Sequence, residues 1–185
     1  MFREGYSPRE HYSGRQHERD LFGGINTNSN AYQEEFQRIA NERGYMPRNA
    51  ALELVKHHQP WQDASNPDKD FLRELTIAVR DHLNLDAEQS NDVRAYTAVG
   101  TPLDVFHGTD AFLTIREGGR EFVITLDATR NAKKLEEGGK ADVIVGDMPT
   151  PEDEEDAYLA AIDSIAEEVV RNVKRQSEPP NAMRF

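Results

Sequence analysis

The chain has no cysteine among its 185 residues. Disulfide bonds, zinc sites built on thiolates and cysteine nucleophiles are therefore excluded, and an oxidising compartment is not needed. The sequence also lacks an apolar run approaching the roughly 20 residues that cross a bilayer, and its first residues lack the apolar segment of a secretory signal. We expect a cytoplasmic protein with no membrane partner.

Basic side chains are few relative to acidic ones. The chain has 22 Lys and Arg against 34 Asp and Glu, a formal net charge of -12. This charge opposes nonspecific attraction to phosphate backbones, so nucleic-acid binding would require a local basic surface or a metal ion. The charge balance counts against a nuclease. The apolar content of 37% is enough for one hydrophobic core.

The chain divides into three parts by composition and periodicity. Residues 1–28 have no helical or strand periodicity and mix arginine, glycine and asparagine with scattered aromatics. We predict an arm there that is disordered, or ordered by a protein partner that it contacts. Residues 29–176 are predicted to form a single globular domain, and 177–185 a short C-terminal tail.

Apolar side chains recur at helical spacing in the first half of this domain, and again near the chain's end. They predict a helical N-terminal part at 29–83, with helices at 30–43, 47–58 and 67–83. A short turn of helix at 86–93 has little support. A last helix follows an acidic stretch and ends near Arg175, with acids in its first turn and basic residues in its last, as the helix dipole favours.

After Gly100 the spacing of apolar residues changes to that of strands. Residues 111–115 and 122–126 are apolar and β-branched, and two glycines between them predict a hairpin turn. Residues 141–145 form a third run of this type. We therefore predict an α/β (α+β) fold with a three-stranded or larger sheet, in the order helix, strand, strand, strand, helix, preceded by two or three helices.

Two aspartates stand out in these strands. Asp110 precedes the first strand, and Asp127 lies late in the second. Asp110 also suits a turn in which its side chain binds nearby amides. Asp127 is harder to explain structurally, because aspartate is depleted in strands. It is predicted to share a face with Thr125 and Thr129, which gives a polar stripe beside Asp110.

With these acids and this order of elements, the chain resembles the PD-(D/E)XK nuclease-like superfamily over about residues 67–175. The family signature is an acid, a spacer, then acid-X-lysine on the next strand. Asp110 and Asp127 match the acids, and Thr129 stands where the family has its lysine. The resemblance implies a restriction-endonuclease-like core, a nuclease dependent on Mg²⁺ or Mn²⁺, and Asp110, Asp127 and the Ala128 carbonyl as metal ligands.

Further site residues follow from the same resemblance. Lys133 or Lys134, just beyond the strand, is the candidate for the displaced lysine that orients the attacking water. Glu74, in the helix at 67–83, is a candidate metal ligand, with a solvated helix position as its alternative role. His107 is a candidate general base because histidine titrates near neutral pH. Its alternative role is a hydrogen bond within a loop.

Three interpretations remain open at this point. The first is a metal-dependent nuclease acting on DNA or RNA, impaired if no lysine reaches the site. The second is a non-enzymatic binding or assembly subunit of the same fold that contacts its partner through residues 1–28, which the acidic balance and the missing lysine favour. The third is a helical interaction domain at 29–83 joined to an unrelated hairpin module. Carboxylates of Asp110 and Asp127 within about 5 Å would be able to share a cation.

Overall fold

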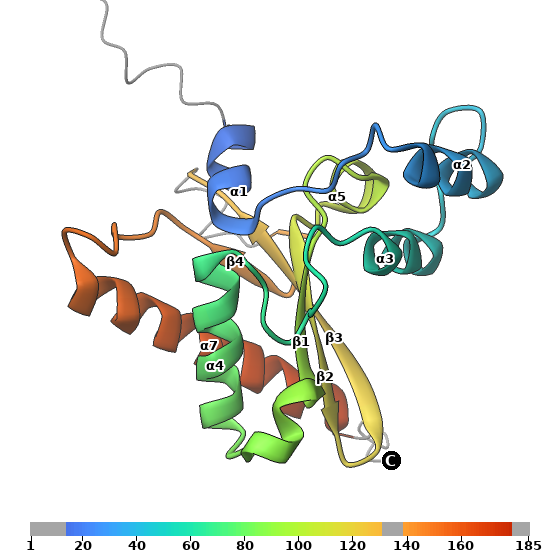
Figure 1. Ribbon diagram of the computed structural model, residues 1–185. Helices are drawn as coiled ribbons and strands as arrows, with labels where there is room; N and C mark the ends of the chain where they lie inside the picture. The colour runs from blue at the N-terminus through green and yellow to red at the C-terminus, as the bar shows by residue number, and fades with distance from the viewer. Residues whose placement is uncertain (1–13, 131–138, 179–185) are drawn as a thin grey trace, which may run out of the picture.

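The structure is a computed structural model that describes residues 14–130 and 139–178. It is a mixed α/β fold in which a four-stranded sheet carries helices on both faces (Figure 1). Neighbours in sequence are neighbours in the sheet, and the order is β1-β2-β3-β4. The strands are β1 (Val93–Thr97), β2 (Ala111–Glu117), β3 (Arg120–Ala128) and β4 (Val143–Val145). The first three pair antiparallel, and β4 pairs parallel to β3.

The predicted hairpin is confirmed as β2 and β3. Their register runs from Ala111 opposite Leu126 to Glu117 opposite Arg120. Gly118 and Gly119 form the two-residue turn with φ of 57° and 78°. Only glycine adopts such angles without strain, and turns of this hand match the twist of the strands. The register therefore leaves Asp110 and Asp127 at the far end of the hairpin from its turn.

The sequence analysis missed two short elements between residues 93 and 107. One is β1, whose antiparallel pairing with β2 begins at Val93 opposite Ile115. The other is helix α5 (Pro102–His107), which begins with proline in its first turn and ends at Gly108, with φ of 62°. Strand β1 has Arg94 among its five residues, so it lacks the apolar run that marks 111–115. A helix of six residues is too short to show an apolar period, so only its end signals were available.

One face of the sheet is covered by α4 (Asp70–His82) and α7 (Glu155–Ser177), two predicted helices that the structure confirms. The two helices lie against each other across this face (Figure 1). Between α4 and β1, the 3-10 helix η2 (Ala87–Asp92) begins with a capping box. Apolar side chains of both helices and of all four strands form one buried cluster, which includes Leu75, Val79, Leu113, Ile124 and Val169.

The opposite face carries α2 (Asn30–Ile39), α3 (Arg48–His57) and α5. Their buried side chains meet Tyr96 and Phe112 of the sheet, whose rings stack at 4.9 Å. The helices of residues 29–83 thus pack on both faces of the sheet, so the interpretation as a separate helical module is wrong. Helix α2 ends before its predicted limit, because the Asn41 side chain accepts the amides of Arg43 and Tyr45 and forms a turn.

Part of the predicted N-terminal arm is helical instead. Residues 14–22 form α1 (Gly14–Phe22), and Phe22 is fully buried against Phe71, with ring centroids 5.6 Å apart. The apolar residues of α1 stand together at its C-terminal end, which leaves no periodic stripe to recognise. Residues 1–13, the rest of the arm, and most of the predicted tail at 177–185 lie outside the described residues. None of the described helices is long and apolar enough to cross a membrane.

Phe22→Ala should lower the free energy of unfolding by about 3–5 kcal/mol, the usual effect of emptying a buried phenylalanine site. Urea unfolding followed by circular dichroism measures the change. Ile77→Ala is the matched control because Ile77 is 43% exposed, and it should change stability by less than about 0.5 kcal/mol. Equal stability of the Phe22 variant and the wild type would show that α1 is not docked in solution.

Candidate functional site

The two predicted aspartates lie side by side at one end of the hairpin. Asp110 directly precedes Ala111, and Asp127 directly follows Leu126, the pairing partner of Ala111. The amide of Asp110 donates to the carbonyl of Leu126 at 2.9 Å. Both acids are buried, with 3% of Asp110 and 5% of Asp127 exposed. The sheet thus holds two carboxylates where water reaches them poorly.

A backbone amide fixes the Asp110 carboxylate. The N–H of Ala128 donates to Oδ2 of Asp110 at 2.9 Å. The sequence analysis assigned Ala128 a role through its carbonyl, as a metal ligand. The structure shows a contact between this residue and Asp110 through the Ala128 amide. An amide of strand β3 therefore orients the Asp110 side chain. Aspartate side chains in turns commonly accept such hydrogen bonds from backbone amides.

Two further acids that the sequence analysis missed complete the group. Glu18 of α1 and Asp104 of α5 each bring a carboxylate oxygen to Asp110, and these three oxygens lie within 4.8 Å of one another. Asp104 is oriented by the amide of Gly100, which donates to its Oδ2 at 2.8 Å. We call Glu18, Asp104, Asp110 and the adjacent Asp127 the acidic group. Asp127 lies beside the set of three and is not one of it.

The acidic group changes the ionisation of Asp110. Burial, followed by the neighbouring charges of Glu18, Asp127 and Asp104, raises its pKa to about 8, against the lowering effect of the Ala128 hydrogen bond. Without a cation, Asp110 is therefore protonated at neutral pH. A divalent cation among these carboxylates would replace the repulsion by attraction and favour the ionised form.

The donors of the acidic group fit a hard cation. All are carboxylate oxygens, the ligands that Mg²⁺, Mn²⁺ and Ca²⁺ prefer. Three oxygens within 4.8 Å of one another need small side-chain movements to coordinate one ion. Glu18, Asp104 and Asp110 are thus the residues best placed to hold it, with Asp127 next to them.

Helix α1 is anchored around Glu18 by several contacts besides Phe22. The Lys69 ammonium donates to the carbonyl of Asp20 at 3.3 Å. His17 places Nε2 3.9 Å from Oδ1 of Asp147, which also accepts from Nε of Arg130 at 3.1 Å. Burial lowers the pKa of His17. These contacts hold Glu18 toward the end of the hairpin.

Two other predicted site residues lie outside the acidic group. The imidazole of His107 has Nε2 3.0 Å from the carbonyl of Met46, so this histidine links α5 to the segment before α3. Glu74 has Oε1 4.0 Å from Nε of Arg73, and it lines a hollow with Tyr158 at the start of α7. The structure therefore does not bring His107 or Glu74 to Asp110.

The lysine position is the least complete part of the site. Lys133 and Lys134 lie outside the described residues. Thr129, where the resemblance would have a lysine, is buried and donates its amide to the carbonyl of Val145 at 2.8 Å. A further lysine, Lys140, lies with its side-chain carbons 3.5–4.0 Å from the position that a Cβ of Gly108 would occupy. It approaches the end of α5, two residues before Asp110.

Comparison of the chain with protein-family models, curated proteins and solved structures found no match. Its function is therefore inferred from the residues of the site and their surroundings.

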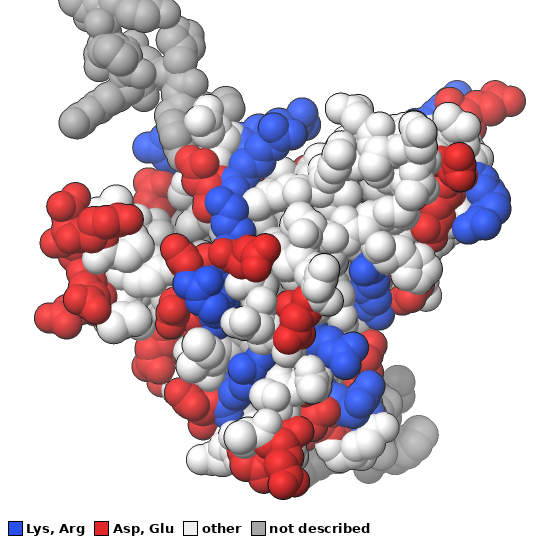
Figure 2. Space-filling view, viewed as in Figure 1, with Lys and Arg blue, Asp and Glu red and all other residues white. Residues whose placement is uncertain are grey.

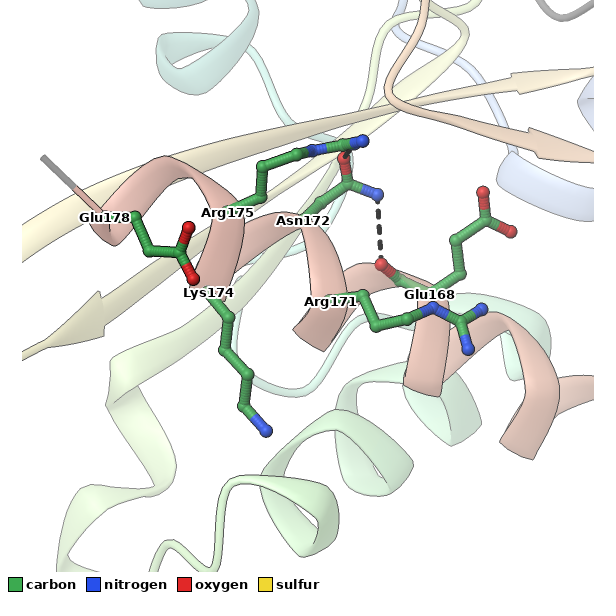
Figure 3. Close-up of a pocket in the computed structure, with 6 residues that line it drawn as sticks. All are labelled: Glu168, Arg171, Asn172, Lys174, Arg175 and Glu178. Carbon is green, nitrogen blue, oxygen red and sulfur yellow. Dashed lines mark hydrogen bonds between the residues drawn. The ribbon is translucent and has the colours of Figure 1, made fainter. Parts of the chain in front are cut away.

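A larger hollow, of about 400 Å³, lies along the C-terminal half of α7. Figure 3 shows the side chains that line it, with Asn172 donating to the carbonyl of Glu168. Asn172 also accepts from Arg175. Arg120, at the turn end of β3, donates to the carbonyl of Ser177, so this hollow is near the other end of a strand about 25 Å long. It is separate from the acidic group.

The metal-free protein should lose stability as pH rises from about 4 to about 8. In this range folded Asp110 keeps a proton that the unfolded chain releases, so unfolding becomes more favourable with pH. Asp110→Asn should not show this loss. At pH 8 its free energy of unfolding should therefore exceed that of the wild type by about a few kcal/mol. Urea unfolding at several pH values in chelator measures this. Glu42→Gln, at an exposed acid, should keep the wild-type slope; the same slope in the Asp110 variant would contradict the assignment.

Mg²⁺ or Mn²⁺ should raise the melting temperature, because a ligand that binds only the folded state stabilises it, by about 2.7 kcal/mol at 100 times its dissociation constant. Glu18→Gln should weaken the cation's affinity at least about tenfold, through loss of a charged ligand. Asp163→Asn tests the second set of ligands within reach of one another, His82, Asp163 and Glu167, and should leave the affinity unchanged. The reverse pattern would place the cation between α4 and α7.

Proposed function

We propose that this protein is a divalent-cation-dependent phosphodiesterase that cleaves nucleic acid. The observation that carries the proposal is the pair of buried carboxylates, Asp110 and Asp127, at the same end of β2 and β3. A buried acid is costly unless it is protonated, paired or bound to a cation. The nearby oxygens of Glu18 and Asp104 supply the further ligands that a cation site would require. A cation would also relieve the repulsion that, after burial, helps to raise the pKa of Asp110 to about 8.

The arrangement of elements supports a PD-(D/E)XK-like core. Helix α4 precedes three antiparallel strands, with α5 between the first two. Asp110 directly precedes the second strand, and Asp127 lies on the third. Helix α7 follows and covers the same face of the sheet as α4 (Figure 1). This order is similar to the α-β-β-β-α order that the resemblance implies, with α5 and a fourth strand, β4, in addition.

The residues of the acidic group have separate tasks in this proposal. Asp110, Glu18 and Asp104 would hold the cation, with Asp127 beside them as a further ligand. The Ala128 amide fixes the Asp110 carboxylate, and the Gly100 amide fixes that of Asp104. A bound Mg²⁺ or Mn²⁺ supplies Lewis acidity toward the phosphate and lowers the pKa of a ligand water. Hydrolysis joins the water oxygen to phosphorus and breaks one phosphorus–oxygen ester bond, and the leaving oxygen takes up a proton.

Lys133 or Lys134 is proposed to orient the attacking water from the connection between β3 and β4. That connection begins directly after Thr129 and returns at Lys140 near Gly108, so both of its described ends lie near the acids. The net charge of -12 gives the cation a second task. It must offset the repulsion between the acidic surface and the substrate phosphates.

A second candidate function is a cation-binding subunit of the same fold without catalysis. The observation that favours it is Thr129, a buried residue joined to β4 in the position where a catalytic lysine would be expected. Such a protein would bind its partner through residues 1–28, of which α1 already contacts the acidic group through Glu18. Cation binding without cleavage would identify this function.

The deciding experiment incubates end-labelled DNA and RNA, each single- and double-stranded, with protein and Mg²⁺, Mn²⁺ or chelator. We expect cleavage only with a cation. Asp127→Asn should lower the rate at least about 100-fold, since a cation contributes several kcal/mol to the transition state and each 1.36 kcal/mol is tenfold. Lys133→Ala combined with Lys134→Ala should lower it as well.

Asp163→Asn is the matched control, because Asp163 is exposed on α7 and lies 2.7 Å from His82 rather than near the acidic group. It should cleave at the wild-type rate. Unchanged cleavage by the Asp127 variant would contradict the proposed site. A wild-type protein that is stabilised by the cation and cleaves none of the four substrates would support the second candidate.

A further inference from the structure

A hollow of about 250 Å³ lies between α2 and α5, beside the acidic group. Three aromatic side chains line it: Tyr32 and Phe36 of α2, whose ring centroids lie 6.1 Å apart, and Phe106 of α5. Phe106 is 36% exposed and the neighbouring Val105 59% exposed. Exposed apolar side chains around a concave site are typical of ligand-binding surfaces.

The residues that line this hollow are all uncharged, in a protein with a net charge of -12. Figure 2 shows the same contrast, since the surface over α5 and toward α2 is largely free of Lys, Arg, Asp and Glu. Acidic side chains gather instead near the start of α7, at the left of the view. The hollow is thus suited to the uncharged part of a ligand.

The hollow and the acidic group share a wall. Gly100 lines the hollow, and its amide donates to Oδ2 of Asp104 at 2.8 Å. Asp104 in turn lies within 4.8 Å of Glu18 and Asp110. Residues two positions apart on a helix point about 200° apart, so α5 directs Asp104 to the acids and Phe106 to its other side, where Phe106 lines the hollow. One short helix serves both.

We propose that this hollow receives an unstacked base of single-stranded nucleic acid whose neighbouring phosphate lies at the acidic group. This inference rests on the proposed function and adds its substrate class. A nucleotide joins a flat, uncharged ring to an anionic phosphate, and the protein offers an uncharged aromatic hollow next to a group that holds a cation. In a duplex the base is stacked and paired, so it would have to be extruded first.

Base stacking would also provide binding free energy that phosphate contacts cannot provide in a protein with a net negative charge. Each base stacked on an aromatic side chain contributes substantially whatever its identity, whereas phosphate contacts require basic groups. Two of the polar side chains at the hollow are engaged within the protein. Gln33 donates to the carbonyl of Thr27 at 2.6 Å, and Thr101 donates to that of Ala98 at 2.7 Å. Recognition through stacking predicts little preference among base sequences.

The test measures fluorescence anisotropy of a labelled strand of about 16 nucleotides, the upper size of single-strand sites on small domains. The same strand is compared alone and annealed to its complement, in chelator to prevent cleavage and again with Ca²⁺, which also takes oxygen ligands. We expect the single strand to bind at least about tenfold more tightly than the duplex, and the cation to strengthen binding.

Phe106→Ala removes a wall of the hollow and should weaken single-strand binding about tenfold. Val105→Asp adds a negative charge at the hollow and should weaken single-strand binding similarly. Val105 is more exposed than Phe106. Ile77→Ala is the matched control, an exposed apolar residue on α4. Melting temperatures near that of the wild type establish that the variants are folded.

Equal affinities of Phe106→Ala and Ile77→Ala would overturn the inference, as would equal affinity for single strand and duplex. Sedimentation that shows a wild-type dimer dissociated by Val105→Asp would also overturn it, since a second copy would then occupy the hollow. If the wild type and Asp127→Asn both bind the single strand in chelator and the wild type cleaves nothing, the result supports base binding in the hollow and contradicts the nuclease function. If the wild type cleaves and Phe106→Ala cleaves at the same rate, the result supports the nuclease function and contradicts base binding in the hollow.

Discussion

The hydrogen bond from the Ala128 amide to the buried Asp110 carboxylate is the interaction on which the site depends. It holds the acid at the point where three separate elements meet: the hairpin of β2 and β3, helix α5 and helix α1. Glu18 and Asp104 reach Asp110 only because both helices are docked there. Burial and mutual repulsion of these carboxylates are unfavourable for folding. The large apolar cluster under α4 and α7 must outweigh this cost.

The long elements of the fold were predictable from the sequence, and the short ones were not. Helices α4 and α7 carry apolar stripes over several turns, and the hairpin has two strands around a Gly-Gly turn, so periodicity identifies them. Helix α5 has too few residues to show a period, and Arg94 interrupts the apolar residues of strand β1. The residues of α1 are mostly polar, and Phe22 alone among them is buried. Helix α1 docks through the contact of Phe22 with Phe71, and a tertiary contact of this kind is not visible in the local sequence pattern.

Which residues of the acidic group could be predicted also depended on whether they lie near elements with a recognisable apolar pattern. Asp110 and Asp127 were found because both border apolar runs, and aspartate is unusual there. Glu18 and Asp104 belong to the elements that were missed, so their sequence context gave no signal. Glu74 and His107 were candidates by residue type, and the structure gives them other partners, Arg73 and Met46. Residue type and order of elements thus identified the centre of the acidic group, and tertiary packing supplied the rest.

The docking of α1 also has a consequence for how the protein matures. Over a hundred residues separate Glu18 from Asp127, so the contacts of the acidic group have high sequence separation. Closing such a loop costs entropy and slows folding. During synthesis, α1 emerges before α4 and the hairpin, so the surface to which it binds appears only later. The acidic group therefore assembles late, and an incomplete chain that ends before β3 carries Glu18 and Asp104 without the strand that fixes Asp110.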